Sequence, residues 1–376
     1  MKKLSLLILA LLVNLSFAYA QEFARVRDND KFGFIDKSGA MVITSQFDKA
    51  GNFSEGHAAA FKDKKWGFID TSGKWVIQPS YDKVKAFNSG YALVLKDDQW
   101  NYIDTSGNIL NTPVQEKFYD FNERGIAFYR IGKKIGLMNT NAKVILEPTY
   151  DVIKPFVDGH ARVRNGDMWG MIDLTGKVTI PVEYSKLSDY RTKAIWAAKG
   201  ESYGVLVNGK FEIVASASKI WDFTNESDLT YARKGKKVGF INAKGEWVIE
   251  PTFDKARAFK NGLAPVAKEK SWGYINEQGA EVVGFNYRDA EIFADNGLAP
   301  VKEKKLWGFI DSTGKMVIPA QYNITAGGLS LFSKNNIKGF HNGMARVRYK
   351  KTWGFITEDG QPLGGKWYQN AENFSE

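Results

Sequence analysis

The sequence predicts an all-β chain made of about ten short units that follow one another at a nearly constant spacing. One observation is a phrase that returns along the chain: KWGFIDTSGKWVIQPSYD at residues 65–82 is repeated as LWGFIDSTGKMVIPAQY at residues 306–322. Another is that apolar and charged residues alternate within the units, as they do in strands with one buried face. A third is that no segment keeps the 3.6-residue period of a helix for long.

The spacing is measured from the residue before the repeated glycine, a position that we call the slot. Successive slots lie 34 or 35 residues apart, except for a last step of 46. The slot residues are Phe32, Trp66, Trp100, Ile135, Trp169, Tyr203, Val238, Trp272, Trp307 and Trp353. Such a period is typical of a solenoid, a propeller or another repeat array. We therefore expect one array over residues 21–376 and not two or three separate globular domains.

Each unit divides into short strands with turns between them. An alternating run such as Ala345 to Arg348 predicts the first strand, and Trp66 to Asp70 predicts the second. The glycine of a Thr-Ser-Gly turn can take the left-handed backbone that a short hairpin loop needs. A third strand, Trp75 to Ile77, leads into Pro79, which suits a strand end or a sheet edge. The units are thus predicted to be mostly three-stranded and antiparallel.

The sequence leaves two arrangements of these units open. Phe374, Ser375 and Glu376 repeat the phase of residues 53–55, so the first strand could complete the last unit as it does in a closed propeller. Ten units exceed the usual four to eight blades. An open, solenoid-like or superhelical array is therefore the favoured prediction, and a closed propeller-like ring is the alternative.

Two stretches depart from the pattern. An insertion occupies about residues 323–340, and a degenerate repeat occupies about residues 195–228. In a repeat protein such places either carry a function or mark sequence drift. Drift is the favoured interpretation.

The repeated phrase resembles the bacterial WG-containing repeat, also called the KWG repeat, over nearly everything after residue 22. The match rests on Lys-Trp-Gly-Phe-Ile-Asp-x-x-Gly-Lys-x-Val-Ile-x-Pro-x-Tyr-Asp and on the preceding Gly-Leu-Ala-Pro-Val. The resemblance implies a bacterial, often exported protein that serves as a binding or scaffolding array. It implies no general enzymatic activity, and it supplies no catalytic residue and no cofactor.

Residues 1–20 are expected to be a signal peptide. Lys2 and Lys3 precede an apolar stretch, and Ala18-Tyr19-Ala20 gives the small-x-small pattern of a cleavage site, so cutting is expected between Ala20 and Gln21. No later stretch reaches the roughly 20 apolar residues that a membrane-spanning helix needs. The chain has no cysteine and therefore no disulfide framework. We expect an exported bacterial protein, located in the periplasm, on the outer surface or outside the cell.

The tryptophan–glycine pairs are expected to be structural. Phe, Ile, Tyr and Val fill the slot in other units, which indicates that the slot requires volume and burial more than a flat ring for stacking sugars or bases. The glycine would let a neighbouring strand approach closely. The predicted structural positions are Trp66, Gly67, Trp100, Trp169, Gly170, Trp272, Gly273, Trp307, Gly308, Trp353 and Gly354.

The repeated turn carboxylates and the three histidines give no enzyme or metal signature. Asp36, Asp70, Asp104, Asp173 and Asp311 sit at hairpin turns where Asn139, Asn242 and Asn276 occur in other units, so both residue types are expected to cap the turn. The histidines form no cluster with metal-ligand spacing. We therefore predict no catalytic residues, no metal site and no cofactor.

Lysines in the turns before the last four slots are the best functional hint in the sequence. They could form a ridge for an anionic polymer, although lysine also protects sheet edges from association, which is the favoured interpretation. The ridge residues are Lys236, Lys237, Lys268, Lys270, Lys304, Lys305, Lys350 and Lys351. The formal charge of +10 falls to +8 without Lys2 and Lys3 and favours anionic partners only mildly.

The favoured function is a non-enzymatic exported scaffold or binding protein that engages a protein or an anionic polymer of the cell envelope. Nucleic acid is a less favoured partner for an exported chain. Two alternatives stay open. One is a hydrolase with its site near the insertion or the degenerate repeat, and the other is a purely structural spacer or adhesin stalk.

Overall fold

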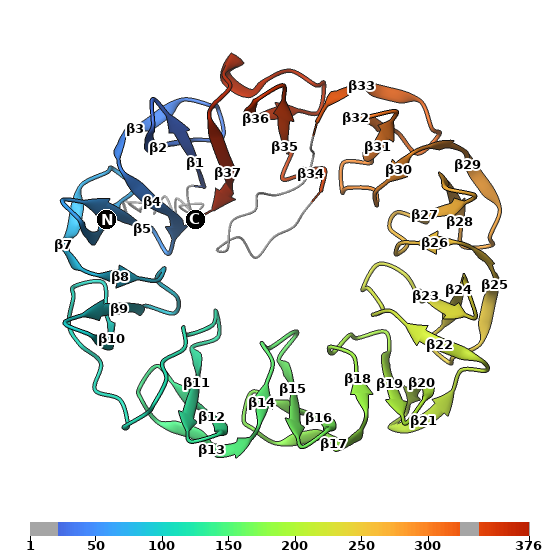
Figure 1. The fold of residues 1–376 in the computed structure, drawn as a ribbon, viewed down its shortest axis with the longest axis horizontal. Helices are drawn as coiled ribbons and strands as arrows, with labels where there is room; N and C mark the ends of the chain where they lie inside the picture. Colours follow the sequence, from blue (N-terminus) through green and yellow to red (C-terminus); the bar gives the residue numbers. More distant parts are fainter. Residues whose placement is uncertain (1–21, 324–337, 376) are drawn as a thin grey trace, which may run out of the picture.

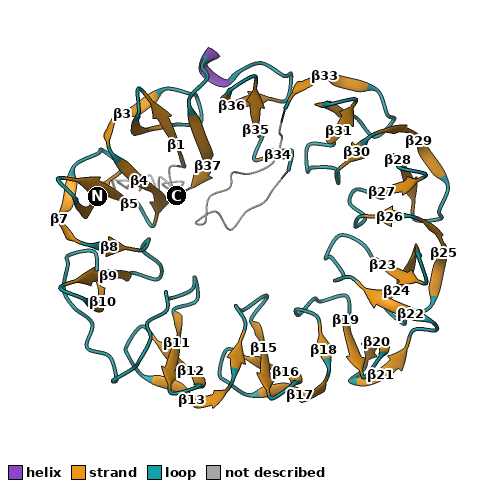
Figure 2. Ribbon diagram, viewed as in Figure 1, coloured by secondary structure: helices purple, strands orange, loops and turns teal. Residues whose placement is uncertain are grey.

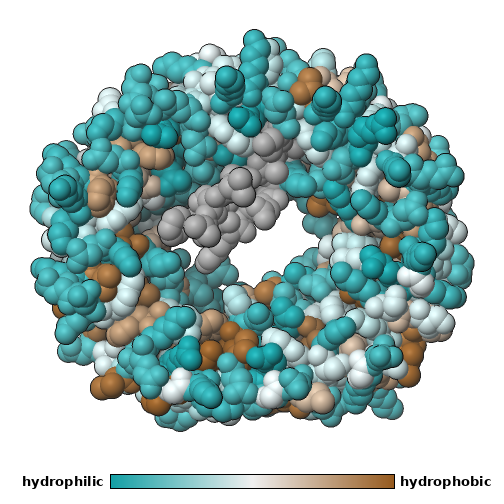
Figure 3. Space-filling model, in the orientation of Figure 1, coloured by the Kyte–Doolittle hydropathy of each residue, from teal (hydrophilic) through white to brown (hydrophobic). Residues whose placement is uncertain are grey.

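The computed structural model describes residues 22–323 and 338–375, and these residues form ten small antiparallel sheets in a closed ring (Figure 1). The arrangement is that of a ten-bladed β-propeller. The favoured open array was therefore wrong, and the closed alternative is confirmed. An opening passes through the middle of the ring in the space-filling view, where the visible face is mainly hydrophilic (Figure 3).

Seven of the ten described sheets have four strands and three have three. The four-stranded sheets, in spatial order, are β3 (Met41–Phe47), β2 (Lys31–Ile35), β1 (Phe23–Asp28) and β37 (Asn370–Ser375); β4 (Lys49–Ser54), β5 (His57–Lys62), β6 (Lys65–Asp70) and β7 (Trp75–Tyr81); β14 (Val152–Ile153), β15 (His160–Asn165), β16 (Met168–Asp173) and β17 (Val178–Tyr184); β18 (Lys186–Leu187), β19 (Ile195–Lys199), β20 (Ser202–Val207) and β21 (Lys210–Ile213); β22 (Ala217–Ile220), β23 (Leu229–Lys234), β24 (Lys237–Asn242) and β25 (Trp247–Phe253); β26 (Lys255–Ala256), β27 (Leu263–Lys268), β28 (Ser271–Asn276) and β29 (Glu281–Tyr287); β30 (Asp289–Ala290), β31 (Ala299–Glu303), β32 (Leu306–Ile310) and β33 (Met316–Tyr322). The three-stranded sheets are β8 (Lys83–Val84), β9 (Ala92–Lys96) and β10 (Gln99–Ile103); β11 (Ile126–Ile131), β12 (Lys134–Asn139) and β13 (Val144–Tyr150); β34 (Phe340–His341), β35 (Met344–Tyr349) and β36 (Thr352–Thr357).

The expectation of mostly three strands per unit missed a short strand. In six of the sheets this strand has only two residues, such as Lys255 and Ala256 of β26, which pair with Ala267 and Val266. Two residues are too few to show an alternating pattern, so these strands could not be predicted from the sequence. The loops that follow these short strands turn toward the centre of the ring (Figure 1).

The ring is closed by pairing between the two ends of the described chain. Strand β37 lies antiparallel to β1, with Ala24 opposite Phe374 and Arg27 opposite Asn370. Glu372, at 5% exposed, lies 3.8 Å from the Arg25 guanidinium. Closure gives β1 a partner on both edges, so neither edge is left to pair with another chain.

The long third strand of most units runs along the outer rim (Figure 2). Pro79 and Pro251 lie within two of these strands, which agrees with the expected place of proline at a sheet edge. The second strand shifts register at the slot glycine. A Cβ added to Gly308 would lie 2.6 Å from the Ile318 carbonyl oxygen, so only glycine allows this close approach.

The deepest contacts between neighbouring sheets are made by phenylalanine and tyrosine pairs. Phe68, two residues after a slot, contacts Phe87 of the next unit at 4.7 Å between ring centroids, and both rings are 0% exposed. Equivalent pairs are Phe34–Phe53, Tyr102–Phe121, Phe240–Phe259, Tyr274–Phe293, Phe309–Phe340 and Phe355–Phe374. These pairs bury apolar surface between each sheet and the next, which is what stabilises a repeat array.

The slot tryptophans are less deeply placed than these rings. Trp272 and Trp307 are 6% and 9% exposed, and the other four, Trp66, Trp100, Trp169 and Trp353, are half-buried. Cationic side chains lie over several of them, as Arg346 does over Trp353 at 3.9 Å from the ring centroid. The slot residues therefore lie in the outer part of the hydrophobic core, and the residues two positions later lie at the centre of that core.

The degenerate unit keeps its sheet although its sequence pattern is weak. Strands β20 and β21 are joined by the two-residue turn Asn208-Gly209, with φ angles of 50° and 77°, and their pairing has no register shift. Asn-Gly is a favoured sequence for such tight hairpins.

Most of the insertion, and residues 1–21 with the expected cleavage site at Ala20 and Gln21, lie outside the described residues. The one described helix is the short 3₁₀ turn Leu363–Gly365, and no described helix is long and apolar enough to span a membrane.

Candidate anion-binding pocket

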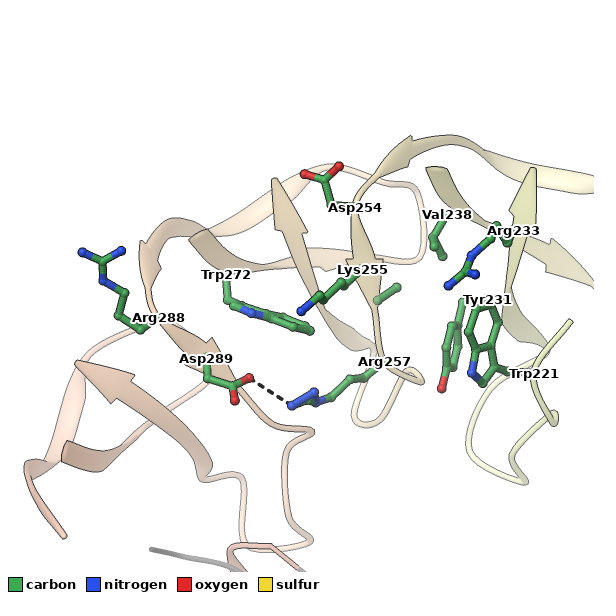
Figure 4. A pocket seen from close by; sticks show the side chains of 11 residues that line it. Trp221, Tyr231, Arg233, Val238, Asp254, Lys255, Arg257, Trp272, Arg288 and Asp289 are labelled. Carbon is green, nitrogen blue, oxygen red and sulfur yellow. Dashed lines mark hydrogen bonds and ion pairs between the residues drawn. The ribbon is translucent and has the colours of Figure 1, made fainter. Parts of the chain in front are cut away.

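A pocket of about 470 Å³ lies between the β22–β25 and β26–β29 sheets, with a contribution from β30. Figure 4 shows Trp272 on one side, Trp221 and Tyr231 on the other, and the head groups of Lys255 and Arg257 between them. Its volume is in the range of small-molecule sites, about 300–1,000 Å³. The pocket borders the degenerate repeat, because Trp221 lies within that stretch.

Trp221 forms one wall of the pocket together with Tyr231. The two rings stack with 4.6 Å between centroids and an angle of 22°. The Lys219 ammonium lies 4.3 Å and the Arg233 guanidinium 5.3 Å from the Trp221 ring centroid. Burial raises the pKa of Tyr231, and the nearby Arg257 charge partly offsets that effect. The wall therefore combines neutral rings with cations that the rings hold in place.

Trp221 occupies a repeat position that is polar in several other units. Its main-chain N–H donates to the Tyr231 carbonyl at 3.2 Å, and the N–H of Arg257 donates in the same way to Pro265 at 2.9 Å. The equivalent position holds Lys85, Lys154 and Glu291 in three further units. The sequence signal for this site was Trp221 itself, because it lies outside the slot of its unit, and that slot holds Val238. This site was missed in the sequence because, among the tryptophans, only those in the slots were weighed as candidate binding residues.

Arg257 forms the fixed, charge-balanced part of the pocket. Its guanidinium lies 4.6 Å from the Trp272 ring centroid and bonds both oxygens of Glu291 at 2.9 Å. It also bonds Asp289 at 3.0 Å, and Lys338 pairs with Glu291 at 2.5 Å. Two carboxylates thus neutralise two cations in this network, which orients Arg257 and leaves it no free charge for a ligand.

The other basic residues of the pocket are not balanced in this way. Within the described part of the chain, the side chains of Arg233, Lys255 and Arg288 make no hydrogen bond or ion pair. The remaining carboxylate, Asp254, binds Lys237 at 2.6 Å and the Glu269 N–H at 2.9 Å, and these contacts lower its pKa. The pocket therefore has a positive potential that suits an anionic ligand.

The eight ridge lysines are all exposed, in or beside hairpin turns of four successive sheets. Lys237 reaches the pocket indirectly through Asp254. Lys268 lies 5.2 Å and 5.0 Å from the Phe253 and Phe285 ring centroids, and Lys350 lies 5.2 Å from that of Tyr349. None of the eight lines the pocket. The structure thus separates the ridge lysines from the pocket's unpaired cations.

The turn aspartates act as caps, as expected from the sequence. Asp70 accepts from the Ser72 N–H at 2.9 Å, the Ser72 hydroxyl at 2.7 Å and the Lys74 N–H at 3.0 Å, and these bonds lower its pKa. Asn242 accepts from the N–H groups of Lys244 and Glu246 in the same geometry. This explains the exchange of Asp and Asn between units.

Two of the three histidines lie beside aromatic rings. His57 is 5.1 Å from the Phe87 centroid, and His160 stacks on Tyr190 at 3.9 Å and 13°. Within residues 22–323 and 338–375 no group of three or more His, Cys, Asp or Glu side chains is placed to hold a metal ion.

The ring and its repeat define a β-propeller protein built from short, glycine-containing β units. The family model of the WG containing repeat matches residues 32–66, 66–100, 135–169, 169–201, 239–270, 272–307 and 307–324. These seven stretches make up more than half of the sequence. The chain therefore belongs to the family of WG-containing repeat proteins. A search of curated proteins found no match to it.

Solved structures with a similar course of the chain are distant in sequence. A eukaryotic initiation factor is 10% identical with a TM-score of 0.48, and the alignment covers 94% of this chain and 98% of that one. PorZ, a surface component of the type-IX secretion system of Porphyromonas gingivalis, is 11% identical with a TM-score of 0.27, over 86% of this chain and 52% of that one. Hsv2 of Kluyvelomyces marxianus is 11% identical with a TM-score of 0.33, over 71% and 94%. The ring in Figure 1, and not these likenesses, defines the fold.

Proposed function

We propose that the protein is a non-enzymatic, exported binding scaffold that holds an anionic polymer of the cell envelope in the pocket between the β22–β25 and β26–β29 sheets. The observation that carries the proposal is the set of three cations, Arg233, Lys255 and Arg288, which have no ion-pair partner among the described residues. Unbalanced positive charge beside low-dielectric aromatic walls attracts anions more strongly than charge on an open surface.

The ridge lysines would extend this attraction beyond the pocket. They are spread over successive sheets, as a binding surface for a polymer requires, and the pocket gives one place where the polymer is held more firmly. Exposed charges act mainly on the rate of association and are screened by salt. The pocket cations are exposed as well, but they line one hollow with aromatic walls, and they are expected to set most of the affinity.

The binding test compares an acidic oligosaccharide with its own neutral derivative. Isothermal titration of the protein with oligogalacturonate is expected to show binding, and the fully methyl-esterified oligomer is expected to bind at least about tenfold more weakly. The Lys255→Ala/Arg288→Ala variant should lose the preference. The matched control, Lys270→Ala/Lys304→Ala, should keep it and show only a smaller dependence on salt. Equal binding of the acid and the ester would contradict the proposal.

The proposed role is binding and not turnover. Prolonged incubation with the bound oligomer is expected to leave its length distribution unchanged by mass spectrometry. Shorter products that disappear in a variant of the pocket would support the hydrolase alternative in place of the scaffold.

Export is proposed from the first twenty residues. These residues have the three parts of a signal peptide in order: the positive Lys2 and Lys3, an apolar stretch, and the small-x-small sequence Ala18-Tyr19-Ala20. This order supports cleavage after Ala20. N-terminal sequencing of the protein recovered from a bacterial envelope or medium should begin at Gln21. Recovery of the uncleaved chain from the cytoplasm would contradict this part of the proposal.

A further inference from the structure

Eight of the ten units share a contact between the slot residue and an aromatic residue, and the units around Trp100 and Tyr203 lack it. In the Tyr203 unit the N–H of Val214 bonds the Tyr203 carbonyl, so an outer strand is present but its residue opposite the slot is aliphatic. Wherever a seven-residue outer strand is present, its last residue is aromatic and lies opposite the slot residue. The pairs are Phe32–Phe47, Trp66–Tyr81, Ile135–Tyr150, Trp169–Tyr184, Val238–Phe253, Trp272–Tyr287 and Trp307–Tyr322. Trp353 makes the same contact with Tyr368, and the two residues exchange main-chain hydrogen bonds of 2.8 Å and 2.7 Å. An aromatic residue opposite the slot is thus a regular part of the blade.

The unit around Trp100 has no such residue. The position in phase with Tyr81 holds Gln115, and no outer strand forms there. Pairing along the outer edge of β10 is limited to a bridge between Ile103 and Ile109 and a 2.9 Å bond from the Leu110 N–H to the Tyr102 carbonyl. Within the described residues nothing is paired with Trp100 on this edge. Its main-chain N–H and C=O therefore remain available to an added strand.

A groove occupies the place of the missing contact. It has a volume of about 850 Å³ and lies between residues 98–100 on one side and residues 112–118 on the other. We call it the Trp100 groove. Val114, on its far side, is 93% exposed. Both amide atoms of Gln115 are shielded from solvent and have no hydrogen-bond partner among the described residues. A shielded amide without partners is costly unless something else bonds to it.

We propose that the Trp100 groove binds an extended segment of a partner protein that adds an outer strand to β10 and places an aromatic side chain opposite Trp100. Eight other units define this occupant, because each of them places a Tyr or Phe ring opposite the slot, seven of them at the end of an outer strand. Addition of a strand to an open sheet edge is a common mode of peptide recognition, in which main-chain bonds give affinity and side-chain pockets give specificity.

The chemistry of the groove favours a peptide over a charged polymer. Once its side chain turns out of the shielded position, Gln115 would offer one donor and one acceptor group, which complement the C=O and N–H of a peptide bond. The charged residues that line the groove, Asp98, Glu116 and Lys117, include both signs and give no excess of cations. The groove is thus distinct in chemistry and place from the anion-binding pocket, and the inference does not depend on the proposed function.

The probe is a fluorescein-labelled peptide, WVIEPTFD, which copies residues 247–254 of the chain itself. Fluorescence anisotropy with the full chain should show saturable binding. Replacing the phenylalanine of the peptide by alanine should weaken binding by about tenfold or more, as loss of a central aromatic anchor does in other interfaces. Equal binding of the two peptides, or no binding of either, would overturn the proposal.

Variants of the protein test the same contact from the other side. Gln115→Tyr introduces the ring that eight other units carry, so it should fill the groove and weaken peptide binding by about tenfold or more. Val114→Asp changes a fully exposed residue and should weaken binding without affecting the fold. The matched control is Val76→Asp on the outer strand β7, where Val76 is 43% exposed, and it should leave binding unchanged.

Two further outcomes would assign the groove differently. If the chain itself associates as its concentration rises, and Gln115→Tyr abolishes this association, the occupant is a second copy and the partner-segment proposal is overturned. If Gln115→Tyr folds with an unchanged circular dichroism spectrum but binds the peptide as well as the wild type does, the peptide binds elsewhere and the proposal is also overturned.

Discussion

Gly279, in the turn between two strands of one sheet, packs against the side chain of Ile249 in the preceding sheet. A Cβ added at Gly279 would lie 3.3 Å from Ile249 Cγ2. The same contact joins Gly73 to Ile43, Gly176 to Leu146, Gly314 to Val283 and Gly360 to Ile318. In these five units the turn thus rests on the third strand of the unit before it, so the contact helps to set how these blades follow one another around the ring.

The first prediction separates this contact from backbone strain. Gly279 has φ of 81°, and Gly262 has φ of 74° but nothing within 4 Å of an added Cβ. Gly262→Ala should cost about 1–2 kcal/mol of unfolding free energy for the left-handed backbone alone. Gly279→Ala should cost more, because the methyl group also displaces Ile249. Chemical denaturation of both variants measures the difference, and equal losses would show that the contact does not matter.

The second prediction concerns the centre of the core. Phe87 is 0% exposed and contacts Phe68, so Phe87→Ala should destabilise the protein by about 3–5 kcal/mol. Trp169 is half-buried, with Arg162 and Arg164 at 5.6 Å and 5.5 Å from its ring centroid, so Trp169→Ala should cost less. Thermal denaturation of the two variants tests the order. A larger loss for Trp169→Ala would make the slot tryptophan the main core residue.

The third prediction concerns the charges at the closure of the ring. Burial lowers the pKa of Arg25 and of Arg346, and Glu372 opposes this effect in both. Glu372→Gln removes the carboxylate from a buried site that holds two guanidinium groups. The variant should lose about 3–5 kcal/mol of stability. Glu358→Gln, at an exposed position, is the control and should be neutral. A stable Glu372→Gln variant would mean that pairing of the strands alone closes the ring.

The fourth prediction concerns pH. Hydrogen bonds from Ser or Thr hydroxyls lower the pKa of Asp36, Asp70, Asp173 and Asp311, and the Asn108 amide does the same for Asp104. A carboxylate whose pKa is lowered by folding stabilises the protein above its unfolded pKa of about 3.9. That stabilisation is lost as the pH falls through the lower folded pKa.

The test of this prediction uses asparagine, because Asn139, Asn242 and Asn276 already cap equivalent turns. Replacing the five aspartates by Asn should reduce the loss of unfolding free energy below about pH 4 relative to the wild type. Denaturation at a series of pH values measures both proteins. Parallel curves would show that other carboxylates cause the acid sensitivity.

Much of the fold could be predicted because the repeat shows its strands ten times. The alternating residues Ala345 to Arg348 fall within β35, and Trp66 to Asp70 fall within β6. The two-residue strands could not be predicted, since Lys83 and Val84 carry no periodic pattern. The repeat phase of Phe374 indicated a closed ring, whereas the number of units favoured an open array. The pairing of β37 with β1 shows that the ring is closed.

The site was harder to predict than the fold. The sequence singled out the slot tryptophans and the turn lysines because both recur. The pocket instead depends on Trp221, a tryptophan outside the slots, and on Lys255 and Arg288 from the following units, which line the same pocket. Residues of different units come together in this pocket because the blades pack side by side, and the repeat pattern alone does not show which residues meet.

Closure of the ring is the central claim, and a pair of introduced cysteines tests it most directly because the chain has none of its own. Arg27 and Asn370 lie opposite each other in β1 and β37. Their Cα atoms should therefore be about 4.5–5.5 Å apart, within reach of a disulfide. The Arg27→Cys/Asn370→Cys variant should form an intramolecular disulfide in native buffer, seen as faster migration in non-reducing gels, and should not do so in denaturant. Absence of that disulfide in the native protein would mean that the two ends do not meet and that the array is open.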